Sequence, residues 1–411
     1  VTACKVAEVR TLSRSLARAS CRILSEPGEL VLPRNGGCAV VQATCPPKAH
    51  DALPTGPGVE ILHQNAGEAM RSRAARFLTV PLVHGGQVDL RRNGTVFYDE
   101  FRNADDVMDR IRELVRLAPG IAELIELEPA TTELRHILAV RLRGKLWQPG
   151  SPRVLLTYTL HAREWISTMA GVYALEHTIL AAAENPEDFA NMEIVFVPLS
   201  NPDGFVHSST TDRFWRKNKG VHEGCQGVDL NRNFNWQWHR KYDDDDSQPQ
   251  DFLKWEAATC GEVFAGMSPS SEPEVLALQS IAEEAPLTVH VDFHSCGGYI
   301  LGPWSFMRTA HPRMDEVVQL GNSLQEAIRS LEGSEYEFCT GNSCLYPVAG
   351  DFPDYSTALG ALGFTVEMRP AVHGNVGMHN MAPPHDQILP NAEENFEAVL
   401  EAIAFARKSR G

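Results

Sequence analysis

The chain has 411 residues, of which 43% are hydrophobic and 22% charged, enough for one large folded domain and a smaller one. Its 37 basic residues are outnumbered by 53 acidic residues, and the net charge of −16 argues against a nucleic-acid partner because phosphates would be repelled. No stretch approaches the roughly 20 apolar residues of a membrane-spanning helix, so we expect no membrane partner.

Residues 1–92 differ in composition from the rest of the chain. They hold four of the nine cysteines and the Pro/Gly-rich stretch CPPKAHDALPTGPGVE. Basic residues then gather in RSRAAR (71–76) and at Arg91 and Arg92, which is typical either of an exposed linker that trypsin-like proteases cut or of an ordinary basic surface. We therefore treat residues 1–92 as a separate N-terminal region.

The cysteine content indicates where the protein functions. Nine cysteines favour an oxidising compartment, and the sequon Asn93-Gly94-Thr95 fits secretion. A chain that begins at Val1 rather than Met is expected to have lost a leader segment already. We expect a secreted or extracellular protein, with a vacuolar or lysosomal location as the alternative.

From residue 93 onward the pattern is that of an α/β domain. Helical spacing covers 105–118, 166–183 and 391–408, and short apolar runs rich in Val, Ile and Phe cover 136–142, 153–160, 192–200, 287–293 and 363–368. Strands that alternate with helices predict a mostly parallel sheet covered by helices on both faces.

Polar residues follow three of these predicted strands. His161 and Glu164 follow 153–160, His294 follows 287–293, and Glu367 lies in the last run. In such sheets, ligands bind at the carboxyl ends of the strands, and catalytic zinc takes three ligands from His, Asp and Glu. The set His161, Glu164 and His294 therefore predicts a site for one Zn²⁺ ion. Taken alone, an H-x-x-E motif is more typical of a structural role, in which His161 caps a helix and Glu164 pairs with Arg163.

The residues around this motif resemble the zinc signature of the metallocarboxypeptidases of the carboxypeptidase A and B type. The resemblance begins with HAREWIS (161–167) and continues in order through FWRKNKG (214–220), GVDLNRNF (227–234), VDFHSCGG (291–298), LYPVAGDFPDYS (345–356) and FTVEMRP (364–370). It covers about residues 95–411 and implies an eight-stranded mixed sheet between helices, with residues 93–411 as the catalytic domain.

The resemblance implies hydrolysis of the C-terminal residue of peptides and proteins by a zinc-bound water that Glu367 activates as general base. The other implied roles are oxyanion stabilisation by the second of two cations in the basic loop, here Lys219 three residues after Arg216, binding of the substrate α-carboxylate by Asn231 and Arg232, closure by Tyr346, and support of His161 by Asp229. Arg163 and Asp351 are further candidates for contact with the substrate.

The chain departs from the family pattern at two positions. Lys219 replaces an arginine in the basic loop, and Cys296 replaces an aromatic residue two positions after His294. A lysine can still stabilise an oxyanion, although it lacks the planar fork of arginine. Cys296 is either a small buried hydrophobe or, in the alternative interpretation, the nucleophile of a cysteine-dependent hydrolase.

The residues of the pocket for the last side chain of the substrate favour a basic side chain, or a mixed preference. Family members place an apolar residue or an acid at the selecting position, which is Pro353 here, but Asp351 could pair with Lys or Arg. By alignment with the family, the lining comprises Leu301, Ser305, Gly341, Val348, Asp351, Pro353 and Thr365.

Family members often bridge the positions of Cys225 and Cys260. Cys339 and Cys344 bracket a turn-like loop and are candidates for a second bridge, the four N-terminal cysteines could form two more, and Cys296 is then left over. The acidic run YDDDDSQPQD (242–251) is either a solvated insertion or a calcium site.

Residues 1–92 occupy the place where the family keeps an inhibitory prosegment, so we expect a zymogen that cutting near Arg91 and Arg92 activates. We also expect a monomer. The alternative to an enzyme is a zinc-binding, peptide-recognising module without catalysis, and the presence of Glu367 favours the enzyme.

Overall fold

The computed structural model describes residues 97–238, 260–332, 334–340, 343–370 and 378–409, together with seven short strands between residues 2 and 89. Contacts divide the chain into two compact units, Val1–Val80 and Pro81–Gly411. None of the described helices is long and apolar enough to cross a bilayer. Several predictions concern residues outside the described ones, namely the four N-terminal cysteines, RSRAAR, the boundary at residue 92, the sequon, the acidic run 242–251 and Gly341.

The first unit contains short antiparallel strand pairs. Strand β1 (Thr2–Ala3) lies between β3 (Ala39–Val40) and β5 (Val59–Glu60), and β2 (Arg22–Ile23) pairs with β4 (Ala43–Thr44). Strand β6 (Thr79–Pro81), which ends at the first residue of the second unit, forms a two-stranded sheet with β7 (Gln87–Asp89).

The second unit is built on an eight-stranded sheet, as predicted. Its order is β16-β15-β17-β14-β10-β11-β9-β8, with four parallel and three antiparallel pairings, so the sheet is mixed and mostly parallel. The strands are β8 (Ala122–Leu127), β9 (Ile137–Arg143), β10 (Arg153–Tyr158), β11 (Glu193–Val197), β14 (Val289–Ser295), β15 (Tyr299–Gly302), β16 (Glu337–Thr340) and β17 (Leu362–Met368). A separate hairpin joins β12 (Val221–His222) to β13 (Cys225–Gln226).

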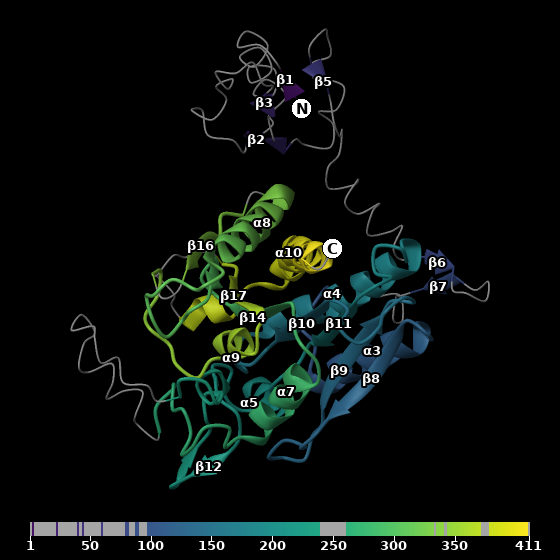
Figure 1. Ribbon diagram of the computed structural model, residues 1–411. Helices are drawn as coiled ribbons and strands as arrows, with labels where there is room; N and C mark the ends of the chain where they lie inside the picture. The colour runs from purple at the N-terminus through teal and green to yellow at the C-terminus, as the bar shows by residue number, and fades with distance from the viewer. Residues whose placement is uncertain are drawn as a thin grey trace. The chain divides into compact units, whose positions relative to one another are not determined.

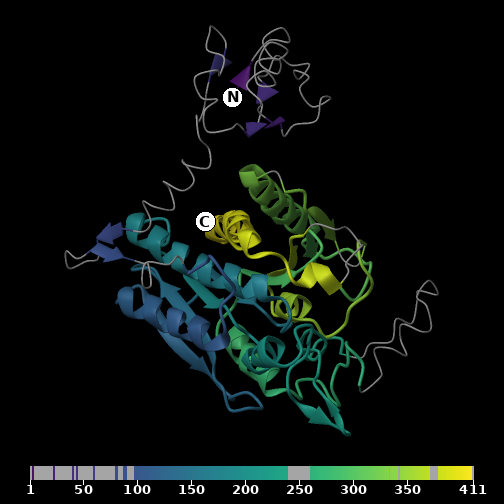
Figure 2. The same cartoon turned by 180° about the vertical axis from the view of Figure 1, so that it is seen from behind.

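Helices cover both faces of this sheet (Figures 1 and 2). On one face lie α4 (Trp165–Glu184), α8 (Met314–Glu332) and α10 (Ile388–Lys408), and on the other lie α7 (Pro273–Glu283) and α9 (Phe352–Ala358). Helix α3 (Ala104–Leu117) contacts α4 and strands β8 and β9, and α5 (Pro202–Thr210) contacts α3. Because α4 touches the sheet, α3 and α10, it is apolar on nearly all sides.

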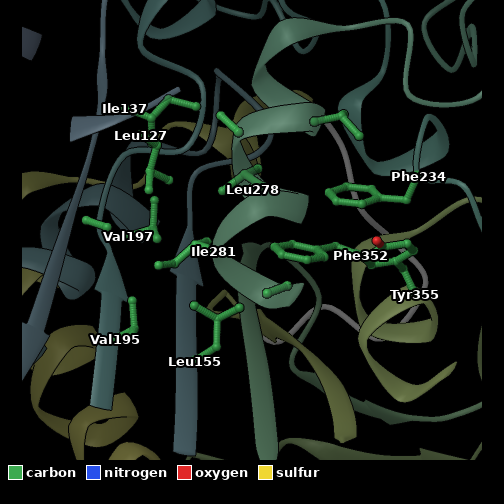
Figure 3. Packing of buried hydrophobic residues seen from close by; sticks show 14 of the residues in the cluster. Leu127, Ile137, Leu155, Val195, Val197, Phe234, Leu278, Ile281, Phe352 and Tyr355 are labelled. Carbon is green, nitrogen blue, oxygen red and sulfur yellow. The ribbon is translucent and has the colours of Figure 1, made fainter. Parts of the chain in front are cut away.

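The core between the sheet and α7 shows why the central strands are apolar throughout. Leu155 and Val197 from β10 and β11 lie opposite Leu278 and Ile281 of α7 (Figure 3). Because successive side chains point to opposite faces and both faces are covered, every residue of β10, β11 and β14 is buried. The polar residues that remain in these strands are therefore costly unless they are paired.

Candidate metal centre

Two neighbouring strands bring the three predicted zinc ligands together. His161 and Glu164 lie between the end of β10 and the start of α4, and His294 lies near the end of β14. Because β10 and β14 are parallel neighbours, their carboxyl ends meet at one edge of the sheet. All three side chains are buried there.

The ligand atoms face a common point. His161 Nδ1 is 2.8 Å from Glu164 Oε1, His294 Nδ1 is 3.1 Å from Glu164 Oε2, and the two Nδ1 atoms are 2.9 Å apart. Within the described part of the chain, the other group of such side chains is Glu337, Cys339 and Cys344, whose two cysteines form a disulfide. Two imidazoles and one carboxylate are the donor set of a catalytic zinc site and leave a position open for water, so the residues fit one Zn²⁺ ion.

A buried acid supports each histidine from behind. His161 Nε2 lies 3.2 Å from Asp229 Oδ1, and His294 Nε2 lies 2.8 Å from Asp292 Oδ2. A carboxylate at Nε2 holds the proton there, which leaves the Nδ1 lone pair of each ring for the metal. Our sequence analysis predicted Asp229 but missed Asp292. The alternation His290-x-Asp292-x-His294 in an otherwise apolar strand is the signal that could have revealed it.

Asp229 is held as an anion by cations as well as by His161. Burial acts to raise the pKa of Asp229, but the guanidinium groups of Arg216 and Arg232 outweigh burial and hold it well below its usual range. Arg216 contacts Asp229 Oδ2 through Nε at 2.9 Å and Nη2 at 2.8 Å. The structure thus brings Arg216 to the metal centre.

Glu367 lies beside the metal ligands on β17. It stands opposite His294 in the parallel pairing of β14 and β17. Burial raises the pKa of Glu367 to about 7, and Glu164 acts in the same direction, while His294 and Arg216 oppose the shift. The neighbouring Arg369, which could have paired with Glu367, instead donates from Nε to Glu394 of α10 at 2.9 Å.

A short 3-10 turn, η2 (Leu230–Arg232), carries the predicted carboxylate-binding residues. Asp229 caps the turn by accepting the Asn231 N–H at 3.0 Å. The Asn231 side chain accepts from Phe352 N at 2.9 Å, and its amide nitrogen lies 3.3 Å from His294 Nε2. Arg232 Nη2 lies 3.4 Å from the hydroxyl of Tyr346, which is 38% exposed. The 3-10 turn therefore places Asn231 beside the zinc ligand His294 and Arg232 beside Tyr346.

Lys219 and Arg163, which were predicted to act on the substrate, contact residues other than the zinc ligands. Lys219 Nζ is 3.1 Å from His207 Nδ1 and 5.1 Å from the centre of the Trp215 ring. Arg163 Nη1 is 3.1 Å from Glu262 Oε2. This packing explains why Arg216 and not Lys219 reaches Asp229, since the ammonium of Lys219 lies against an aromatic ring.

The predicted side-chain pocket contains a buried acid pair at the start of α9. Asp354 accepts from Ser305 N at 2.8 Å and from Phe306 N at 3.2 Å, whereas Asp351 Oδ1 has no hydrogen-bond partner in the described structure. Burial raises the pKa of Asp351 to about 6, and burial together with Asp351 raises that of Asp354 well above its usual range. Pro353 is the second residue of α9.

Backbone hydrogen bonds and strand pairing connect four further lining residues of the pocket. Val348 N donates to Ser305 O at 3.0 Å, and Leu301 pairs with Thr365 between β15 and β17. Gly350 has φ +71°, and a Cβ there would lie 2.4 Å from the carbonyl oxygen of Arg232. A left-handed conformation and this close approach both require glycine.

The cysteines pair as predicted where they are described. Cys225 is bonded to Cys260 and Cys339 to Cys344, while Cys296 is free and buried. Burial, with smaller contributions from Glu367 and Glu164, raises the pKa of Cys296 to about 12. A reactive cysteine needs a lowered pKa, so this environment argues against a thiol nucleophile.

Comparison with known proteins identifies relatives of this arrangement. The family model for zinc carboxypeptidases matches residues 107–398. A metallocarboxypeptidase A-like protein of Trichophyton verrucosum is 27% identical over 356 residues, which cover 83% of this chain and 78% of the relative. Carboxypeptidase B of Astacus astacus is 27% identical over 272 residues, or 64% of this chain and 84% of the relative. Metallocarboxypeptidase A of Arthroderma otae is 31% identical over 289 residues, which cover 66% of this chain and 64% of the relative.

Solved structures show the same fold. The crystal structure of thrombin activatable fibrinolysis inhibitor aligns with a TM-score of 0.68 at 19% identity, covering 99% of this chain and 98% of the other. Carboxypeptidase A from Helicoverpa armigera aligns with a TM-score of 0.66 at 20% identity, covering 99% and 96%.

Proposed function

Because this chain belongs to the zinc carboxypeptidase family and is a metallocarboxypeptidase, we propose that it removes C-terminal residues with a basic or mixed side-chain preference. The observation that carries this preference is Asp351, which is 2% exposed and has an oxygen without a hydrogen-bond partner in the described structure. A buried carboxylate oxygen is costly to leave unpaired, and the ammonium or guanidinium group of a substrate would pair it.

The catalytic roles follow from the geometry of the metal centre. Zinc bound by His161, Glu164 and His294 supplies a Lewis acid that lowers the pKa of water and polarises the substrate carbonyl. Glu367 takes the proton of the attacking water and delivers it to the leaving amine. Glu367 stands opposite the ligand His294 in the pairing of β14 with β17, and this position beside the zinc ligands supports its role.

Cations bind the two negative charges of the reacting substrate. Arg232, with Asn231, binds the planar α-carboxylate of the peptide end, and Tyr346 closes over it from the exposed rim. Arg216 stabilises the developing oxyanion. Its contact with Asp229, a partner of His161, supports this role for Arg216 over Lys219, which lies against His207 and Trp215.

The N-terminal region would regulate this site. We propose that residues 1–92 act as a prosegment for a catalytic domain of residues 93–411, and that the protein is secreted and monomeric. Two disulfides in the described structure support an oxidising compartment.

A peptide panel varied only at its last residue, assayed with and without a zinc chelator, tests the preference. We expect chelation to abolish all cleavage and peptides ending in Lys or Arg to be cut fastest. Asp351→Asn should lower kcat/KM for these peptides by about 10- to 100-fold, because it removes a buried ion pair with the substrate. It should change kcat/KM for peptides ending in Leu less than threefold.

The matched control is Asp188→Asn, which changes an exposed aspartate. It should leave the whole panel unchanged. Cleavage of peptides ending in Phe or Leu tenfold faster than those ending in Lys or Arg would show that the proposed preference is wrong.

A further inference from the structure

A chain of buried hydrogen bonds leads away from the zinc ligand His294. Asp292 accepts from His294 Nε2 at 2.8 Å and from the Thr157 hydroxyl at 2.6 Å. Thr157 Oγ1 is also 2.9 Å from His290 Nε2, and His290 Nδ1 is 2.8 Å from the hydroxyl of Ser356 on α9. All five of these side chains have no measurable exposure to solvent.

The order of these contacts follows from strand geometry. His290, Asp292 and His294 are two residues apart on β14, so their side chains share one face of the sheet. Thr157 stands directly opposite Asp292 in the pairing of β10 with β14. Ser356 is on α9, which covers this face. The pocket acids lie at the start of the same helix, Asp351 as its N-cap and Asp354 in its first turn.

The hydrogen atoms can be assigned by counting donors. A carboxylate only accepts, so the 2.6 Å contact requires the Thr157 hydroxyl hydrogen to point at Asp292. A hydroxyl has one hydrogen, so His290 must donate to Thr157 through Nε2–H. The Ser356 hydroxyl lies 2.8 Å from both His290 Nδ1 and Pro353 O, and a carbonyl oxygen can accept from Ser356 as well as from Thr357, so the single Ser356 hydrogen can reach either acceptor.

From His290 through Thr157, and from His294, the donors therefore point toward Asp292, which receives one hydrogen from Thr157 and one from His294. His290 is a neutral ring in this assignment, in agreement with burial, which lowers the pKa of His290 to about 4. With both of its oxygens occupied, Asp292 cannot turn away from His294, and His294 Nδ1 stays directed at Glu164.

We propose that Thr157 and His290 are positioning residues for the zinc ligand His294, acting through Asp292, and that they tie the metal centre to the pocket helix α9. Groups behind a metal ligand typically change metal affinity by 10- to 100-fold when they are lost. Loss of the Thr157 hydroxyl would free Asp292 Oδ1 and leave His290 Nε2–H without its acceptor.

The test replaces Thr157 with valine, which has the same shape but no hydroxyl, and with serine, which keeps the hydroxyl. We expect Thr157→Val to raise the zinc dissociation constant about tenfold or more in a chelator competition. It should also shift the visible absorption bands of the Co²⁺-substituted protein. Thr157→Ser should stay within about threefold of wild type and keep the wild-type spectrum.

Thr178→Val is the matched control, because Thr178 is equally buried on α4 and its hydroxyl has no partner in the described structure. It should leave zinc affinity and the Co²⁺ spectrum unchanged. The proposal is overturned if folded Thr157→Val binds zinc within threefold of wild type, or if Thr178→Val weakens binding equally, since general core damage would then explain the loss.

If Thr157→Val does not fold, Asp292→Asn takes its place in the same assay. A tenfold loss of zinc affinity supports the positioning chain, and an unchanged affinity overturns it. Neither readout requires peptide cleavage, so the result is independent of the proposed substrate preference and catalytic roles.

Discussion

Glu367 stands next to His294 across paired strands, and burial raises its pKa to about 7. Glu367→Gln keeps the shape of the side chain and removes its ability to accept a proton. We expect kcat to fall by about 10²- to 10⁴-fold, the usual contribution of a general base, while the zinc content stays at one ion per chain. Steady-state kinetics and metal analysis of the same preparation check this. Activity within threefold of wild type would rule out the assigned role.

Glu274 on α7 is another buried carboxyl with a raised pKa, and it lies outside the metal centre and the pocket. Asn218 donates to it at 2.9 Å, but burial, with Asp203 and Glu272, raises the pKa from 4.5 to about 7. Between these two pH values the folded chain holds a proton that the unfolded chain has released. The contribution of Glu274 to stability is therefore largest below pH 4.5 and is lost by pH 7, at a cost of about 3 kcal/mol.

Glu274→Gln should remove this loss, because glutamine can accept the same hydrogen bond without ionising. In urea unfolding with zinc in excess, the variant should be more stable than wild type at pH 8, and this advantage should shrink or vanish at pH 5. Glu187→Gln, at an exposed position, should show no such pH dependence. An equal difference at both pH values would contradict the prediction.

At the scale of elements, an ion cluster holds the antiparallel side of the sheet. Glu193 of β11 is 2% exposed and contacts Arg153 Nε at 2.5 Å and Arg143 Nε at 2.6 Å, so β9, β10 and β11 meet at one carboxylate. Burial alone would raise the pKa of Glu193, but the neighbouring guanidinium groups lower it.

Glu193→Gln leaves Arg153, itself 2% exposed, without its closer carboxylate, so that the half-exposed Glu284 at 3.2 Å is the counter-charge that remains. We expect a loss of about 3–5 kcal/mol in the free energy of unfolding, as for other broken buried ion pairs. Glu123 provides the comparison, because it is the exposed partner of an ion pair with Arg141. Glu123→Gln should lower the free energy of unfolding by less than about 1 kcal/mol. Equal effects in the two urea titrations would mean that the cluster adds no more than a surface pair.

The elements that carry the metal ligands could be predicted from sequence because two signals agreed. Apolar runs such as 153–160 and 287–293 read as buried strands, and His161 and His294 follow them at the end where ligands bind. Asp292 was missed because the alternation of His290, Asp292 and His294 places the three on one strand face but does not show what Asp292 contacts until the register with Thr157 is known.

The placement of Lys219 could not be predicted for a related reason. Residues 216 and 219 are both cations on one loop, and their spacing does not say which one points toward the metal. That choice depends on His207 and Trp215, which take up the ammonium of Lys219. Contacts between segments distant in sequence decide it, and local patterns do not contain them.

At the scale of the whole molecule, the proposed prosegment makes activity depend on cleavage. Limited trypsin treatment should cut near Arg91 and Arg92 and raise kcat/KM on a peptide ending in Arg. Mass spectrometry of the product and a parallel assay check both statements. Replacing both arginines with Gln should prevent the activation, whereas complete cleavage without a gain in activity would count against an inhibitory prosegment.

Gly350 connects the two recognition tasks of the enzyme. Its α-carbon lies so close to the Arg232 carbonyl that no side chain fits between them. Any change in backbone that reshaped the pocket at this point would also displace the anchor for the peptide end. New substrate selectivity should therefore arise from exchange of side chains such as Asp351, with the loop path conserved, which gives protein engineers a definite place to start.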